Sequence, residues 1–259
     1  MIDVALERVP DVPQRVDTRG MLLSGRAEVV FPSEPESAAD GFVVSVPDAG
    51  LASIVGRPPR ALIRDAVERL EGHVNVLCLP ADAAYVAAAL AGWLPAVAIL
   101  HTLPHRPEWS AEVDEASRVF TAVDTPHLTH VPGPLRRELL DALRGRTTAR
   151  FVPGELPDRD APPPLEAVPM SASWAGALPV SFCYPVVRTE SWWDVAVETI
   201  EAYRRQGHAG RAVRALVRHL WTTGRAPVWG TLDDNTGSLA LARQLGFREV
   251  GRLTVFAAP

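Results

Sequence analysis

The sequence predicts an α/β fold, and three observations support this prediction. Short β-branched runs such as residues 42–46 are typical of strands. Other segments, such as residues 207–221, place apolar side chains on one helical face and arginines on the other. The composition, 47% hydrophobic and 22% charged over 259 residues, is that of a globular protein with a sizeable core.

The first half of the chain begins with residues 1–40, which are rich in Pro, Glu and Ser and are interpreted as a loose lead-in. Regular elements are expected from there on. They are a strand at 42–46, a helix at 60–70, a strand at 74–79, a helix at 82–91 and a strand at 96–100. Between 104 and 134 the signals are mixed, with a helical stretch around 110–120.

The second half contains the clearer pattern. After a helix at 135–143, the proline-rich residues 151–169 indicate an extended surface loop, because proline removes backbone donors and fixes φ. We expect strands at 170–174, 179–187 and 192–199, a helix at 207–221, a strand at 227–232, a helix at 236–245 and a strand at 248–256. The expected organisation is an N-terminal α/β domain at 1–128 and a second domain at 129–259.

The junction between the expected strand at 192–199 and the next helix carries the pattern Arg-x-x-Gly-x-Ala, formed by Arg204, Gly207 and Ala209. Small residues let the backbone approach an anion closely, and the first amides of a helix have no internal partner. Those amides and the helix dipole favour a pyrophosphate, and Arg204 and Arg205 add positive charge. Packing is the other explanation for small residues at a helix start.

A second strand-to-helix junction follows at Asn235, and its helix ends in Leu245-Gly246-Phe247 before a final strand. The ordered set of strand, Arg-x-x-Gly-x-Ala loop, helix, strand, Asn-bearing loop, helix, Gly-Phe and strand resembles the GNAT acyltransferases. The resemblance spans about residues 130–259 and is closest over 180–256. Residues 181–209 also look like a bacterial GNAT subgroup with a Thr-Glu-x-x-Trp-Asp segment before the cofactor strand.

The resemblance implies a mixed central sheet flanked by helices, and acetyl-CoA as the co-substrate. It implies that the main chain of Val197, Glu198 and Thr199 pairs with the pantetheine arm. Asn235 would contact the cofactor, and an amide near 197–199 would stabilise the thioester oxyanion. The pyrophosphate would be held by the loop residues Arg204, Arg205, Gln206, Gly207, His208, Ala209 and Gly210.

The acid–base residues depart from the family pattern. Where many members have a Glu before the Asn loop, residues 228–231 contain no carboxylate, and the usual Tyr is replaced by Ala242. The remaining candidates are Glu190, Asp194 and Glu198, each also explicable as a structural or solvated carboxylate. We favour Asp194 or Glu190 as the base through water, and Tyr184 or Tyr203 is the candidate acid. Proximity alone, with water taking the proton, is a further mechanism.

Residues 60–100 repeat the order helix, strand, helix, Gly-aromatic, strand that is seen in 209–256. The repeat indicates either a degenerate second GNAT-like half or a generic α/β fragment. Pro58 and Pro59 precede its first helix, and prolines cannot donate amides to a phosphate. Only the C-terminal domain is therefore expected to bind the cofactor.

The resulting hypothesis is an N-acetyltransferase in which an amine, on a small molecule or a peptide, attacks bound acetyl-CoA directly. A non-catalytic CoA-binding regulatory or interaction protein is the alternative, and transfer of a larger acyl group stays open.

The composition also limits the partners and the location of the protein. A net charge of −5 argues against nucleic-acid binding. Without an apolar run of about 20 residues we expect no membrane span and a cytoplasmic protein. Cys78 and Cys183 are interpreted as buried apolar residues, no metal site is expected, and a homodimer is left open.

Overall fold

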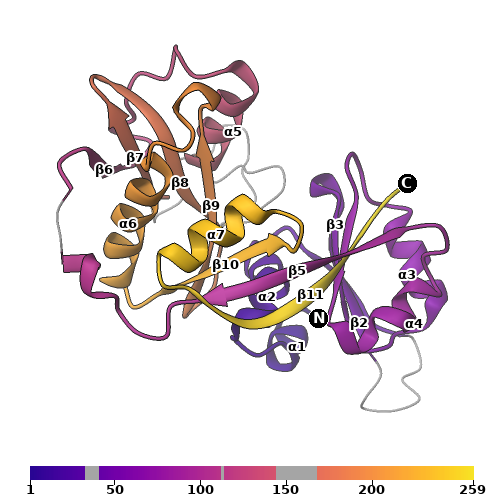
Figure 1. The fold of residues 1–259 in the computed structure, drawn as a ribbon. Helices are drawn as coiled ribbons and strands as arrows, with labels where there is room; N and C mark the ends of the chain where they lie inside the picture. Colours follow the sequence, from indigo (N-terminus) through magenta and orange to yellow (C-terminus); the bar gives the residue numbers. More distant parts are fainter. Residues whose placement is uncertain (33–40, 112–113, 144–167) are drawn as a thin grey trace.

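The computed structural model describes residues 1–32, 41–111, 114–143 and 168–259, which form one mixed sheet of eleven strands flanked by helices (Figure 1). The α/β prediction is confirmed. The surface loop expected at 151–169 lies, apart from residues 168 and 169, outside the described residues. No helix in the described ranges is long and apolar enough to span a bilayer.

The elements of the first half are α1 (Ile2–Arg8), α2 (Val16–Leu23), β1 (Glu28–Val30), β2 (Phe42–Val46), β3 (Leu51–Val55), α3 (Arg60–Val67), β4 (Asn75–Cys78), α4 (Ala83–Ala87) and β5 (Leu94–Thr102), with 3-10 turns at Pro13–Arg15, Pro47–Ala49 and Pro80–Asp82. The loose lead-in expected at 1–40 is wrong over its described part. There, Ala5, Val9 and Met21 are fully buried, so this segment is held by packing rather than by local helical propensity.

The elements of the second half are β6 (Ser117–Phe120), α5 (Gly133–Leu143), β7 (Met170–Ala175), β8 (Leu178–Arg188), β9 (Trp192–Thr199), α6 (His208–Trp221), β10 (Ala226–Leu232), α7 (Thr236–Gln244) and β11 (Arg248–Ala257). The helical stretch expected around 110–120 is wrong. A 3-10 turn at Glu108–Ala111 and strand β6 stand there instead, because residues 117–120 pair with β7 at the sheet edge.

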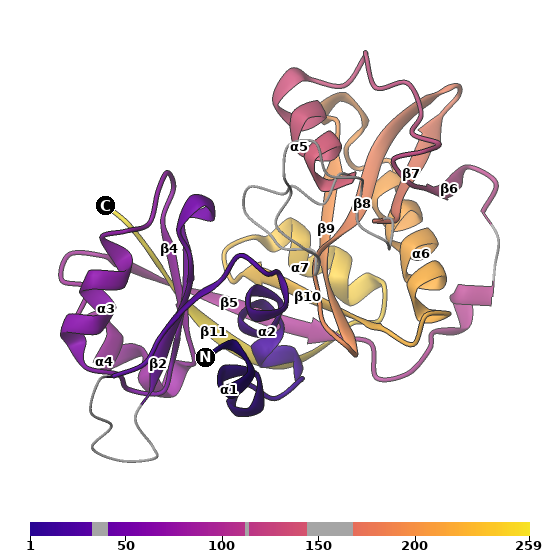
Figure 2. The ribbon, with the colours of Figure 1, turned by 180° about the vertical axis from the view of Figure 1, so that it is seen from behind.

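The strands are ordered β1-β2-β3-β4-β11-β5-β10-β9-β8-β7-β6. Thus β5, from the first half of the chain, lies between β10 and β11 of the second half, and β11 in turn lies between β4 and β5. All the pairings made by β5 and β11 are antiparallel. The two halves therefore exchange strands: β5 is inserted into the sheet of the second half, and β11 into that of the first. The sheet runs without a break through both lobes (Figures 1 and 2).

The two halves repeat one order of elements, since β3-α3-β4-α4-β5 corresponds to β9-α6-β10-α7-β11. Equivalent glycines precede the last strand of each half. Gly92 has a φ of 89° and Gly246 a φ of 88°, and each is followed by an aromatic residue that packs into its half's core, Trp93 or Phe247. The repeat predicted between residues 60–100 and 209–256 is thus present in the structure.

Helices cover both faces of this sheet. On one face, α6 packs with Trp193 and Trp229 in one apolar cluster, and Ile63 of α3 packs with Phe256 in another. The opposite face carries a third cluster, to which α1, α2 and α5 contribute. The two helical pairs α3–α4 and α6–α7 therefore lie on the same face of the sheet, while the N-terminal helices lie on the other (Figures 1 and 2).

The N-terminal segment is also held by polar contacts to the turn between β8 and β9. Asp11 accepts hydrogen bonds from Thr189 Oγ1 (2.6 Å) and from the Ser191 amide (2.8 Å). Trp192 Nε1 donates to the Asp11 carbonyl at 3.1 Å. Because β9 starts at this turn, the N-terminal residues help to fix where β9 begins.

Gly20 of α2 provides a test of that packing. A Cβ at this position would lie 1.8 Å from Cγ1 of Val187 in β8, so we expect Gly20→Ala to destabilise the protein by about 1–3 kcal/mol through overpacking. The matched control is Gly133→Ala at the start of α5, where a Cβ would meet nothing within 4 Å. Thermal unfolding of both variants measures the difference, and equal melting temperatures would contradict this account of α2.

Candidate functional site

The parallel strands β9 and β10 are paired only at their beginnings. Their register runs from Ala226 opposite Trp192 to Val228 opposite Asp194, although β9 continues to Thr199 and β10 to Leu232. Over the described residues no further pairing joins these two strands, so they separate beyond Asp194. By contrast, β3 and β4 pair along the whole of β4, from Asn75 to Cys78. Only the second half therefore has an open gap between its parallel strands.

The backbone of β9 faces this gap in a regular alternation. The Ile200 amide donates to the Val180 carbonyl at 2.9 Å, which makes this a hydrogen-bonded pair of the antiparallel β8–β9 ladder. Alternate residues of β9 then turn their amides and carbonyls away from β8. These residues include Val197 and Thr199, and the Thr199 carbonyl indeed accepts from Arg204 Nε at 3.2 Å. The strand thus presents a polar edge to the gap.

At the end of β9 the chain turns sharply into α6. Arg205 and Gly207 both have left-handed backbones, with φ of 62° and 83°, and Gly207 is the residue before the first turn of α6. The amides of His208, Ala209 and Gly210 open the helix and cannot bond within it. Among the described residues no backbone carbonyl outside the helix accepts from them. The turn therefore forms an amide-lined, electropositive helix start.

Two polar side chains of this turn, those of His208 and Gln206, form hydrogen bonds of their own. The His208 ring is buried and hydrogen-bonds through Nδ1 to Ser173 Oγ at 2.9 Å. Burial, and secondarily Arg211, holds the pKa of His208 below its ordinary value. Gln206 Nε2 donates to the Ala202 carbonyl at 3.1 Å. The turn is thus stabilised by its own polar side chains, while Gly207 is exposed and Gly210 is buried.

Asn235 begins the second helix of this half. Its side-chain Oδ1 accepts from the Ser238 amide at 3.1 Å, so it caps α7 and leaves its NH₂ group outside the cap. Ser238 Oγ in turn accepts from Trp229 Nε1 at 2.9 Å. The Trp229–Ser238 hydrogen bond joins β10 to α7. All three residues line the same cavity.

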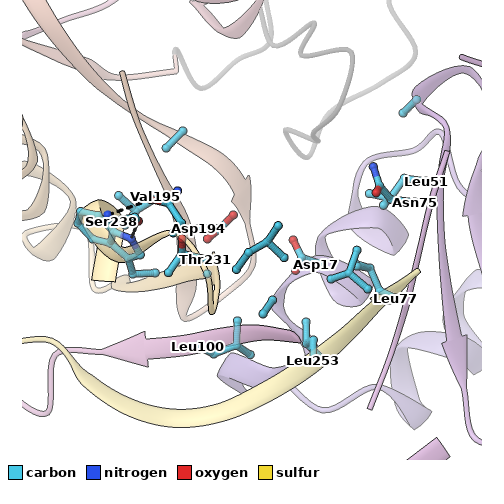
Figure 3. Close-up of a pocket in the computed structure, with 18 of the residues that line it drawn as sticks. Asp17, Leu51, Asn75, Leu77, Leu100, Asp194, Val195, Thr231, Ser238 and Leu253 are labelled. Carbon is cyan, nitrogen blue, oxygen red and sulfur yellow. Dashed lines mark hydrogen bonds between the residues drawn. The ribbon is translucent and has the colours of Figure 1, made fainter. Parts of the chain in front are cut away.

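This cavity, of about 680 Å³, opens where β9 and β10 separate (Figure 3). One wall is formed by the second half, with Asp194, Val195 and Thr231. The floor is formed by the exchanged strands, with Leu100 of β5 and Leu253 of β11. The far wall comes from the first half of the chain, so the cavity exists only because the two halves share one sheet.

Two of the three candidate carboxylates line this cavity, and the third does not. Asp194 and Glu198 both line the cavity, on the same face of β9. Glu190 is not among the described residues that line it. It lies in the β8–β9 turn with its side chain 51% exposed, in a bidentate ion pair with Arg19 at 2.6 and 2.7 Å. The ion pair with Arg19 gives Glu190 a structural role, and a role in proton transfer stays a prediction.

The candidate acids lie away from the cavity as well. Tyr184 is 1% exposed and donates to Glu138 Oε1 at 2.5 Å. Tyr203 packs edge-on against His208, with ring centroids 6.3 Å apart. A thiol nucleophile is not favoured either. Burial raises the pKa of Cys78 to about 12 and that of Cys183 well above its ordinary value.

Several cavity residues have no local sequence signal. Asp17 of α2 lies above the floor formed by Leu100 and Leu253 (Figure 3), yet it is far from the second half in sequence. Asp48 and Glu71 join the far wall in the same way. Their place depends on long-range strand order, which a pattern within one segment does not reveal.

Comparisons with known proteins agree with the loop pattern. Residues 174–256 match the family model described as GNAT acetyltransferase. This confirms the resemblance to the GNAT superfamily that the loop pattern predicted. A search of curated proteins finds no match.

Solved structures share the fold over nearly the whole chain. A GCN5-related N-acetyltransferase-like protein from Streptococcus suis has a TM-score of 0.63 at 14% identity, covering 99% of both chains. A GCN5-related N-acetyltransferase from Kribbella flavida has a TM-score of 0.57 at 14% identity, covering 96% of both. A tandem GNAT protein from the clavulanic acid biosynthesis pathway has a TM-score of 0.52 at 15% identity, covering 99% of this chain and 93% of that one. At these identities the likeness concerns the fold.

The Arg19–Glu190 pair predicts a pH-dependent contribution to stability. The hydrogen bond from Arg19 holds the pKa of Glu190 below its ordinary value, so the ionised pair stabilises the folded state above the normal carboxyl range. This contribution is lost as the pH falls through the lowered pKa. We expect Glu190→Gln to unfold more easily than the wild type at neutral pH, with the gap closing in acid. Denaturant titrations across pH measure it, and a gap that persists in acid would contradict the assignment.

Proposed function

We propose that this chain, which belongs to the GNAT superfamily, is an acetyl-CoA-dependent N-acetyltransferase acting on an amine by direct attack. The observation that carries the proposal is the parting of β9 from β10 next to the amide-lined start of α6. A polar strand edge and an anion-binding helix start, side by side, suit a ligand with an amide-bearing arm and a diphosphate. Acetyl-CoA has both parts.

In this proposal the pantetheine arm of acetyl-CoA lies along the edge of β9 at Val197 and Thr199, whose amides and carbonyls face the gap. The diphosphate lies at the amides between Arg205 and Gly210. Arg204 and Arg205 are exposed there and add positive charge. Asn235 contacts the arm from the other side of the gap through its side-chain NH₂ group.

The reaction needs an unprotonated amine in contact with the thioester carbon. Asp194, at the point where the strands separate, accepts the proton of the ammonium group, directly or through water. The amine nitrogen then bonds to the carbonyl carbon, and an amide of β9 stabilises the oxyanion. As the C–S bond breaks, its electron pair stays on sulfur, and the thiolate takes a proton from water. The proton lost by nitrogen ends on Asp194 or solvent.

We also propose a division of labour between the two predicted domains. We assign cofactor binding and proton transfer to residues 129–259, and the acceptor side of the cavity to residues 1–128. Because β5 completes the sheet beside β10, the first half is also a structural part of the catalytic unit. In that half β3 and β4 stay paired, and Pro59 rather than glycine precedes α3. One acetyl-CoA per chain is therefore expected. Cytoplasmic location and a homodimer stay predictions.

Binding of CoA tests the proposal most directly. Gly207→Ala forces a left-handed alanine into the turn, at about 1–2 kcal/mol, and we expect it to weaken CoA binding about tenfold. The control is Gly224→Ala at the other end of α6. Gly224 has a similar φ of 79°, and a Cβ would meet nothing within 4 Å at either position. Calorimetry with CoA should give one site per chain and an effect of Gly207→Ala alone. No binding to the wild type would overturn the proposal.

Turnover tests the role of Asp194. We expect Asp194→Asn to lower kcat by about 100-fold at neutral pH, with the KM for acetyl-CoA unchanged, because a general base of this kind contributes about that much. The loss should shrink as rising pH deprotonates the amine. Thiol release with a panel of amines gives both values. If Glu198→Gln shows this pH-dependent loss instead, Asp194 is not the base. Tight CoA binding without turnover on any amine would favour a non-catalytic CoA-binding protein.

A further inference from the structure

The cavity extends well beyond the place where the thioester would lie. From Asp194 in β9 it crosses the face of β5 and β11 and reaches Leu51 and Asn75 in β3 and β4 (Figure 3). Four steps across the sheet separate β9 from β4, in the order β9-β10-β5-β11-β4. At the usual strand spacing of about 4.8 Å this is about 19 Å. The space is thus long enough for an extended acceptor.

Acidic residues stand along the whole length of this cavity. Asp194 and Glu198 stand at the thioester end, and Asp17 stands over the middle. Asp48 and Glu71 stand at the far end together with His73. The described lining residues include no Lys or Arg, although Asp48 forms an ion pair with Arg26 just outside the lining. Such a cavity concentrates cations and repels anions.

The floor between the charged ends is apolar. It is formed by Ala98 and Leu100 of β5 and by Leu253 and Val255 of β11, all on the cavity face of the sheet. Apolar surface of this kind favours methylene groups over further charge or hydroxyl groups. An acceptor that fits would therefore carry positive charges separated by hydrocarbon.

On the premise of the proposed function, we propose that the acceptor is a linear aliphatic polyamine. Its primary amine reaches the thioester beside Asp194, its methylene segments lie on the β5–β11 floor, and a distant ammonium group is held by Glu71 and Asp48 of the first half. The N-terminal half of the chain thus acts as the specificity element, which recognises the end of the acceptor that does not react.

Acceptors of increasing length test the reach of the cavity. Thiol release from acetyl-CoA is measured with butylamine, putrescine, spermidine and spermine. Putrescine is far too short to reach from Asp194 to the far wall, so it should resemble butylamine, whereas kcat/KM should rise by up to about fivefold for spermine, since one further exposed ion pair contributes up to about 1 kcal/mol. Equal kcat/KM values for all four amines, or a clear preference for a lysine-containing peptide, would overturn the inference.

Variants of the far wall give the matched test. Glu71→Gln and Asp48→Asn should each raise the KM for spermine about twofold, with the KM for butylamine unchanged. The control is Glu68→Gln, which removes the same charge from an exposed residue just after α3 and outside the cavity lining. Both wall residues are exposed, so their variants should fold, and thermal unfolding verifies this. A Glu71→Gln effect no larger than that of Glu68→Gln would overturn the inference.

The two proposals fail in distinguishable ways. Turnover that is indifferent to chain length and to Glu71 would remove the polyamine while leaving the acetyltransferase intact. Absence of turnover with every amine would remove the acetyltransferase instead. In that case calorimetry with spermine and the CoA-saturated protein decides the remaining question. Binding that weakens in Glu71→Gln supports a polyamine ligand, and absence of binding overturns that too.

Discussion

The pairing of β5 with β11 is the interaction on which the rest of the structure depends. It runs from Arg248 opposite Thr102 to Ala257 opposite Leu94, with one irregularity between Glu249 and Gly251. Because each strand comes from a different half, their hydrogen bonds join the halves more firmly than side-chain packing between two separate domains would. The same pair forms the cavity floor. A change that shifted its register would move the acceptor surface relative to the amide-lined turn of α6.

The site combines one rigid and one open feature, and each has a local cause. The turn at Gly207 is rigid because a left-handed backbone and the bonds of His208 and Arg204 hold it. The gap is open because the β9–β10 ladder ends at Val228, while β10 stays paired with β5 along its other edge as far as Leu232. A bound ligand would thus form hydrogen bonds with the β9 backbone groups that do not pair with β10. In the described part of the first half, β3 stays paired with β4 and Pro59 precedes α3, although the order of elements is the same.

Much of the fold was predictable from local pattern, and the errors share one physical origin. The strands expected at 42–46 and 192–199 occur with those bounds, because β-branched runs specify strands wherever they are buried. The N-terminal helices were missed because α1 is short and owes its order to burial against distant residues. Within the site, the loop at Gly207 has a sequence pattern. Asp17 and Glu71 do not, since only the strand order brings them to the cavity.

The strand exchange also has a consequence for how the protein is made. A chain grows from its N-terminus, so β4 and β5 leave the ribosome long before β11, the strand that separates them in the finished sheet, has been translated. Until then two hydrogen-bonding edges stay uncovered, and such edges invite pairing between neighbouring chains. Neither half could close as an independent folding unit. Co-expressed fragments cut between β6 and α5 would have to find each other and thread two strands before either became native.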